Sequence, residues 1–114
     1  MSKMNLKKLL SVSLLGIMVY STGAMAKEVE VVNISKIAGM PWFNRMGDGV
    51  TDAGKDLGIK AYQVGPSSTD APQQVKIIED LIAKNVSAIT IVPNDADVLE
   101  PVFKKARSAG IVVL

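Results

Sequence analysis

The sequence contains neither cysteine nor histidine among its 114 residues. Without cysteine there is no disulfide bond, no thiolate nucleophile and no thiolate metal site. Without histidine, Ser-His-Asp and Cys-His catalysis and imidazole metal ligation are excluded within these residues. The sequence also lacks the G-x-G-x-x-G, G-x-x-x-x-G-K-[ST] and G-x-S-x-G motifs. We therefore expect no catalytic residue, no metal and no cofactor in this chain.

The net charge is also small once the first 26 residues are considered separately. The formal net charge is +2, but three of the 13 basic residues stand in the first eight positions, and the first acidic residue is Glu28. When residues 1–26 are set aside, ten basic and eleven acidic residues remain, which leaves a net charge of −1. A segment this close to neutrality has no electrostatic reason to bind nucleic acid or an anionic membrane.

The first 26 residues have the order of regions that is typical of a secretory signal peptide. Lysine residues precede an apolar run over Leu9–Tyr20, and Ala24 and Ala26 form the A-x-A motif that signal peptidase accepts. A membrane anchor is the alternative, but a bilayer span needs about 20 apolar residues. We expect cleavage after Ala26, export to the periplasm, and a mature protein over residues 27–114 that is not embedded in the membrane.

Residues 27–114 alternate between strand patterns and helix patterns. The strand patterns are short, largely apolar and rich in β-branched residues, which indicates buried strands. They cover residues 29–34, 59–64, 88–92 and 111–114. With a helical segment between each pair, the order β-α-β-α-β-α-β predicts an α/β fold with a parallel sheet and helices on both faces.

The helical segments have apolar residues at helical spacing and recognisable ends. The first is expected to begin at Pro41 and to end at Gly58, and its glycines would let it lie close to the sheet. Thr69 or Asp70 is expected to cap the second, and the regular part of the third is expected to begin near Pro101. The predicted buried stripes are Phe43, Met46, Val50, Ala53 and Leu57, then Val75, Ile78 and Ile82, then Val98, Val102, Ala106 and Ala109.

Ligands of parallel α/β sheets bind beyond the carboxyl ends of the strands. The loop after the first predicted strand places a cation, Lys36, two adjacent aromatics, Trp42 and Phe43, and an amide, Asn44, around a helix start. Flat aromatics cover the apolar faces of a sugar, whereas charged and amide groups bind its hydroxyls. We therefore expect a small sugar-like ligand at these loops.

Each candidate ligand residue also has a structural alternative. Phe43 is in phase with the helix stripe and could belong to the core, whereas Trp42 is out of phase and is expected to face solvent or ligand. Lys36 could be a solvated loop lysine. Asn94 and Asp95, in the loop after the third predicted strand, could bind ligand or could cap the next helix.

Several short motifs follow one another in a fixed order along residues 27–114. They are Pro41-Trp42-Phe43, Gly47-x-Gly49-x-x-x-Ala53-Gly54-x-x-Leu57-Gly58, Asp70-x-x-x-Gln74, Val92-Pro93-Asn94-Asp95-x-Asp97 and Ala106-x-x-Ala109-Gly110-Ile111-x-Val113. In this order and spacing they resemble the start of a type I periplasmic substrate-binding protein of the ribose/galactose-binding group, which serves ABC transporters. With Lys36 before the aromatic pair, the sequence resembles the autoinducer-2-binding and rhamnose-binding subgroup of this family.

The resemblance implies a two-lobed protein of which residues 27–114 form part of the N-terminal lobe. The sugar would lie between the lobes, closure would follow a hinge motion, and an ABC permease in the inner membrane would be the partner. In the subgroup, a lysine at the position of Lys36 contacts the ligand. No bond would be broken, in agreement with the missing nucleophile and base.

Three alternatives to a transport protein are compatible with parts of the sequence. An exported α/β hydrolase would need catalytic residues beyond Leu114. A repressor-type regulator would need an N-terminal helix-turn-helix, whose place the predicted signal peptide occupies. A truncated, non-functional product would expose a sheet edge, and we expect residues 27–114 to be poorly soluble when expressed alone.

Overall fold

The computed structural model of the protein describes residues 27–114. The predicted signal peptide at residues 1–26 lies outside the described residues. Within them, strands and helices alternate as predicted, and the α/β fold is confirmed. The elements are β1 (Glu30–Ile34), α2 (Pro41–Leu57), β2 (Lys60–Val64), α3 (Ala71–Lys84), β3 (Ala88–Ile91), α4 (Ala96–Ser108) and β4 (Val112–Val113).

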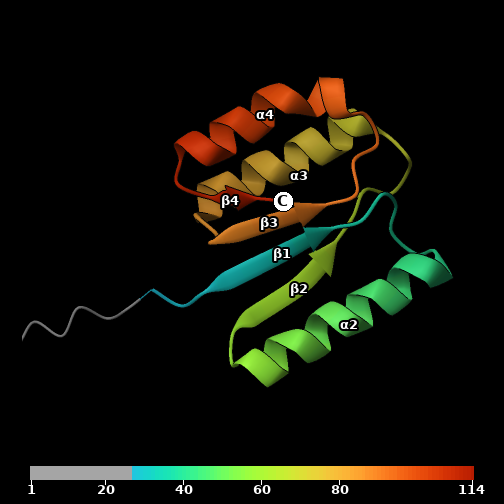
Figure 1. The fold of residues 1–114 in the computed structure, drawn as a ribbon. Coiled ribbons are helices and arrows are strands. Elements are labelled where there is room, and N and C mark those ends of the chain that lie inside the picture. Colours follow the sequence, from blue (N-terminus) through green and yellow to red (C-terminus); the bar gives the residue numbers. More distant parts are fainter. Residues whose placement is uncertain (1–26) are drawn as a thin grey trace, which may run out of the picture.

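The four strands form one parallel sheet in the order β2-β1-β3-β4. Helix α2 covers one face of the sheet, and α3 and α4 lie side by side on the other (Figure 1). All strands point the same way, so the loops that follow β1, β2 and β3 meet at one edge of the sheet (Figure 1). No helix within residues 27–114 is long and apolar enough to cross a membrane.

The two faces of the sheet differ in polarity because side chains alternate along each strand. The face toward α3 and α4 is apolar and contains the core, whereas the face toward α2 has a row of polar side chains. In that row, Asn33 pairs in register with Gln63 on one side and Thr90 on the other. The buried core comprises Val32, Ile34, Ile78, Leu81, Val86, Ile89, Leu99, Val102, Ala106 and Ile111.

Glycine allows α2 to lie close to the edge strand β2, as predicted. A Cβ atom at Gly54 would lie 2.8 Å from the Cβ of Ala61. Only the first half of the predicted stripe is partly buried, however, and Leu57 is 71% exposed. In the last turn of α2, the residue that lies against β2 is Gly54, which is buried. Ala53 and Leu57 are exposed and are not core residues.

Helix α4 begins earlier than predicted. Its first residue is Ala96, and Pro101 lies inside the helix. Oδ1 of Asp95 accepts hydrogen bonds from the backbone N–H groups of Asp97 at 3.0 Å and Val98 at 3.1 Å. These bonds occupy N–H groups that the first turn leaves without a helical partner, so the helix begins before Pro101, which lies in its second turn. The predicted start near Pro101 was wrong.

The earlier start of α4 accompanies a different buried face. Leu99, Val102 and Ala106 are buried, whereas Val98 is 46% exposed and Ala109 is exposed. The predicted stripe was therefore right for Val102 and Ala106 and wrong for the other two. Apolar residues stand at both 98 and 99, so spacing alone did not distinguish which of them faces the sheet.

Candidate functional site

The loops after β1 and β2 are connected by backbone hydrogen bonds. The N–H of Ser35 donates to the carbonyl of Val64 at 2.9 Å, and the N–H of Ala38 donates to that of Pro66 at 2.8 Å. Gly65 lies against this connection, and a Cβ atom there would collide with Oγ of Ser35. The two loops therefore lie in close contact at the strand-end edge.

A glutamine side chain connects the loops after β1 and β3. Gln74, on α3, is 0% exposed. Its Nε2 donates to the carbonyls of Ser35 at 3.1 Å and Val92 at 2.9 Å, and its Oε1 accepts from the N–H of Asn94 at 2.8 Å. The sequence had singled out Gln74 only as part of a motif, with no role. Gln74 stands four residues before Ile78, which is on the buried side of α3, and this spacing could have predicted that Gln74 is buried.

The structure brings together two of the predicted ligand residues, Lys36 and Asn94. Nδ2 of Asn94 donates to the backbone carbonyl of Lys36 at 2.9 Å. Oδ1 of Asn94 is buried and has no hydrogen-bond partner among residues 27–114. Asn94 is thus not the cap of α4. The capping alternative holds for Asp95, whose carboxylate bonds the first turn.

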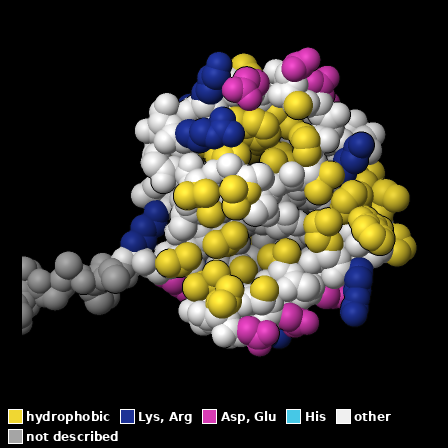
Figure 2. Space-filling view, viewed as in Figure 1, with side chains coloured by type: hydrophobic (Ala, Val, Ile, Leu, Met, Phe, Trp, Pro, Cys, Tyr) yellow, Lys and Arg dark blue, Asp and Glu magenta, His cyan; other side chains and the backbone are white. Residues whose placement is uncertain are grey.

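The aromatic pair lies at the start of α2, with its two side chains in different surroundings. Trp42 is 74% exposed, whereas Phe43 is partly buried, as their helical phases predict. The backbone carbonyl of Phe43 accepts a hydrogen bond from Nε2 of Gln63 at 2.6 Å, so the polar row of the sheet holds this turn of α2. Hydrophobic side chains gather at the end of the molecule toward which the strands point (Figure 2).

Asn44 faces a different part of the surface. It is exposed and lines a cavity of about 350 Å³ between α2 and β2, together with Asp48, Thr51 and Gln63. Neither Lys36 nor Asn94 lines that cavity. Of the predicted ligand residues, Asn44 is therefore the one that the structure does not place with the strand-end loops.

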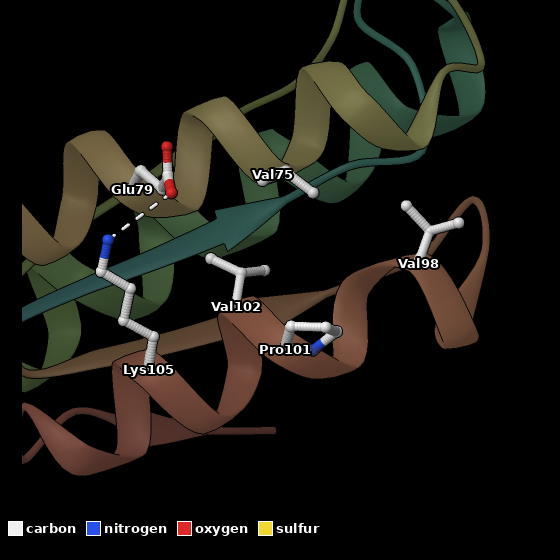
Figure 3. A pocket seen from close by; sticks show the side chains of 6 residues that line it. All are labelled: Val75, Glu79, Val98, Pro101, Val102 and Lys105. Carbon is white, nitrogen blue, oxygen red and sulfur yellow. Dashed lines mark ion pairs between the residues drawn. The ribbon is translucent and has the colours of Figure 1, made fainter.

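Two further cavities lie away from the predicted ligand residues. One, of about 170 Å³, lies between α3 and α4, where Val75 and Val102 face each other and Lys105 forms a 3.5 Å ion pair with Glu79 (Figure 3). The other, of about 280 Å³, lies between β2 and α3. Because no predicted ligand residue except Asn44 lines any of these three cavities, the candidate site is an open surface at the strand-end edge.

The strongest electrostatic cluster of the described residues lies at the opposite, amino-terminal edge of the sheet. Glu30 accepts a hydrogen bond from the hydroxyl of Tyr62 at 2.8 Å and pairs with Lys60 at 3.6 Å and Lys84 at 3.7 Å. The Tyr62 hydrogen bond and the two ammonium groups hold the pKa of Glu30 below its usual value. Glu30 and Lys60 begin their strands, so this cluster joins elements of the fold and is remote from the candidate site.

Ligands of open parallel α/β sheets bind beyond the carboxyl ends of the strands, and this is the edge where the chain has Trp42, Lys36 and Asn94. Residues 31–114 match the model of a family described as the periplasmic binding protein domain. The match covers most of the chain, and the chain belongs to this family.

The chain is similar to curated and solved binding proteins. It is 48% identical over 46 residues, 40% of this chain and 14% of the relative, to the D-ribose/D-allose-binding protein of Pseudomonas aeruginosa. An ABC transporter solute-binding protein of Burkholderia graminis, solved with D-arabinose, is 39% identical with a TM-score of 0.73, over 78% of this chain and 30% of that chain. LsrB of Clostridium saccharobutylicum, solved with AI-2, is 27% identical with a TM-score of 0.73, over 75% and 26%.

These relatives are much longer than the part of them that the chain matches. The chain spans 14% of the curated relative and 30% and 26% of the two solved chains. Their names describe the binding and transport of solutes, not catalysis, and nothing in the comparisons supports the hydrolase alternative. The solved relatives bind D-arabinose and AI-2 at the same TM-score, so structural likeness does not separate the sugar branch from the autoinducer-2 branch.

Proposed function

We propose that this chain is part of a periplasmic solute-binding protein that binds a monosaccharide or a similar small ligand and delivers it to an ABC importer in the inner membrane. The observation that supports this most strongly is the joining of Lys36 and Asn94 by a hydrogen bond at the strand-end edge, in a family whose relatives are named for D-ribose and D-allose. The protein binds and releases its ligand without chemical change.

The chemistry of the strand-end groups suits a sugar. The exposed indole of Trp42 offers a flat apolar face for sugar C–H groups, and Lys36 and Asn94 offer polar groups for hydroxyls. A buried carbonyl oxygen without a donor is unfavourable by about 1–3 kcal/mol, so Oδ1 of Asn94 is an acceptor that a donor from a ligand would satisfy. Asp95 uses Oδ1 for both capping bonds, so Oδ2 is the atom it offers to a ligand. Phe43 completes the set proposed at this edge, whereas Asn44, which lines the separate cavity between α2 and β2, is not part of it.

The class of small ligand can be proposed more closely from Lys36 and from the ligands of the relatives. Lys36 places a cation where a ligand rich in hydroxyl or carbonyl oxygens would approach, and the sequence resemblance based on it favours autoinducer-2 or L-rhamnose. The relative solved with AI-2 agrees with this branch, whereas the relatives named for D-ribose and D-arabinose agree with pentoses. The calorimetric titration described below therefore compares pentoses, L-rhamnose and autoinducer-2.

Export of the protein is part of the proposal. Residues 1–26 would direct the chain through the Sec system and be removed after Ala26, which places the mature protein in the periplasm. The mass and N-terminal sequence of the protein from the periplasmic fraction test this. A mature chain that begins at Lys27 supports the proposal, and an intact leader on the purified protein contradicts it.

Calorimetric titration tests the binding function. The protein, expressed from its complete reading frame, is titrated with D-ribose, D-arabinose, D-allose, L-rhamnose and autoinducer-2, and the bound compound is then released and identified. We expect saturable binding of at least one compound, recovered unchanged. Failure of every compound to bind, or recovery of a hydrolysed product, would overturn the proposal.

Variants locate the binding at the strand-end loops. Trp42→Ala and Lys36→Met should each weaken binding by about tenfold or more, as expected when a contact worth about 1.4 kcal/mol is lost. The matched controls are Leu57→Ala and Lys55→Met, which alter exposed residues at the far end of α2. They should leave the affinity unchanged. Equal losses in both pairs would contradict the proposed location.

A further inference from the structure

At the carboxyl end of the sheet, Gln74 connects the loops that follow β1 and β3. The last backbone hydrogen bond between the β1 and β3 segments is donated by the N–H of Val92 to the carbonyl of Ile34 at 2.9 Å. Beyond this bond, the loop after β1 and the loop after β3 separate. Nε2 of Gln74 donates to the carbonyls of both Ser35 and Val92 and so continues the connection by a side chain where the ladder ends.

The Gln74 amide is fully engaged by backbone atoms of the loops. Both hydrogens of Nε2 have carbonyl acceptors, and Oε1 accepts the N–H of Asn94. A buried amide with all these partners has one orientation, because any rotation leaves buried polar groups unpaired. The residues on either side of these contacts are Lys36, which follows Ser35, and Asn94 itself.

We propose that Gln74 is a positioning residue of the binding site, which holds the loop after β1 and the loop after β3 at the separation that brings Lys36 and Asn94 together. This inference rests on the proposed function, since it concerns the same site. Gln74 is 0% exposed and does not contact ligand; it acts through the backbone of the two loops. The hydrogen bond from Asn94 to the carbonyl of Lys36 depends on that separation.

Gln74→Met is the direct test in the protein expressed from its complete reading frame. Methionine has a similar length but cannot form the three hydrogen bonds. The control is Ile78→Val or Ile78→Ala, whichever lowers the unfolding midpoint equally, because Ile78 is one turn further along α3, fully buried and apolar. We expect Gln74→Met to weaken ligand binding by about tenfold and the matched Ile78 variant by less than about twofold, both measured well below the midpoint.

Hydrogen exchange gives a readout that does not depend on a ligand. In Gln74→Met, the amide hydrogen of Asn94 and those of the loop residues 35–40 should exchange faster than in the matched Ile78 variant, while the amides of β1 exchange equally in both. Equal loop exchange in the two variants, together with equal affinity, would show that Gln74 acts only as a packing residue and would overturn the inference.

Gln74→Glu provides a second test that remains useful when Gln74→Met fails to fold. The ionised carboxylate can accept from Asn94 but cannot donate to the two carbonyls, whereas the protonated acid can donate to one of them. Its affinity relative to the unmodified protein should therefore rise as the pH is lowered, and a ratio that stays constant with pH would contradict the inference. When the unmodified protein binds no compound, the proposed function fails and loop exchange alone decides the role of Gln74.

Discussion

The structural role of Asp95 can be measured apart from its proposed contact with ligand. Replacing Asp95 by Ala removes the cap of α4 and should lower the free energy of unfolding by about 1 kcal/mol, whereas Asp95→Asn should nearly preserve it. Urea unfolding of the two variants checks this. Equal losses in both would show that the two capping bonds are not what stabilises the helix start.

The residues of the candidate site differ in how far their roles could be predicted from the sequence. The exposure of Trp42 follows from its helical phase, and the structure agrees. The spacing of Gln74 from Ile78 indicates burial, although a polar residue in a helix is more often solvated. Its role could not be predicted, because its partners are backbone atoms of Ser35, Val92 and Asn94, which are 18 to 39 residues away along the chain.

Glu30 makes the stability depend on pH. Its folded pKa is lowered from the ordinary value of 4.5, so it stabilises the protein above that pH, and this contribution is lost as the pH falls through the folded pKa. Glu30→Gln should therefore be less stable than the unmodified protein at neutral pH, with the difference shrinking under acid conditions. Tyr62→Phe, which removes the donor and keeps the ring, should reproduce part of the effect. A difference that is constant with pH would contradict this account.

At the scale of elements, the alternation of strands and helices was predicted correctly from residue patterns. The strand bounds agree to within one residue at each end, and Pro41 and Gly58 mark the ends of α2 as expected. The errors fall where tertiary packing decides. The start of α4 depends on the Asp95 cap rather than on Pro101, and in the last turn of α2 the close approach of Gly54 to Ala61 decides which residue is buried.

Two glycines of α2 test how closely this helix packs on the sheet. Gly54→Ala should destabilise the protein by about 1–3 kcal/mol, because the new Cβ would lie 2.8 Å from the Cβ of Ala61 and 3.2 Å from two backbone atoms. Gly49→Ala, on the same helix with nothing within 4 Å, should stabilise it by up to about 1 kcal/mol. Thermal or urea unfolding compares them, and stabilisation by both variants would mean that α2 is not held against β2.

At the scale of the whole molecule, the described residues leave part of the sheet uncovered. Helix α2 contacts β2, whereas β4 is an edge strand in which Val112 is 54% exposed, and Leu114 beyond it is 76% exposed. An exposed apolar strand edge is a template for association with another chain. The helix and strand patterns predict an exposed sheet edge, but which strand forms that edge depends on the strand order.

Expression of residues 27–114 alone tests the consequence of that edge. We expect this polypeptide to self-associate or precipitate, because the exposed backbone and apolar groups of β4 would pair between copies. Analytical ultracentrifugation measures its size. A monomer that unfolds cooperatively would show that the edge is not a liability.

The ligand is proposed to bind at the strand-end edge against Trp42. Trp42 is the single tryptophan of the 114 residues and is 74% exposed, so its emission reports directly on this surface. The most direct measurement is the fluorescence difference between the unmodified protein and Trp42→Phe, both expressed from the complete reading frame, during titration with the compound that calorimetry shows to bind. We expect a saturable shift of the Trp42 emission with the calorimetric midpoint. Binding that leaves this emission unchanged would contradict it.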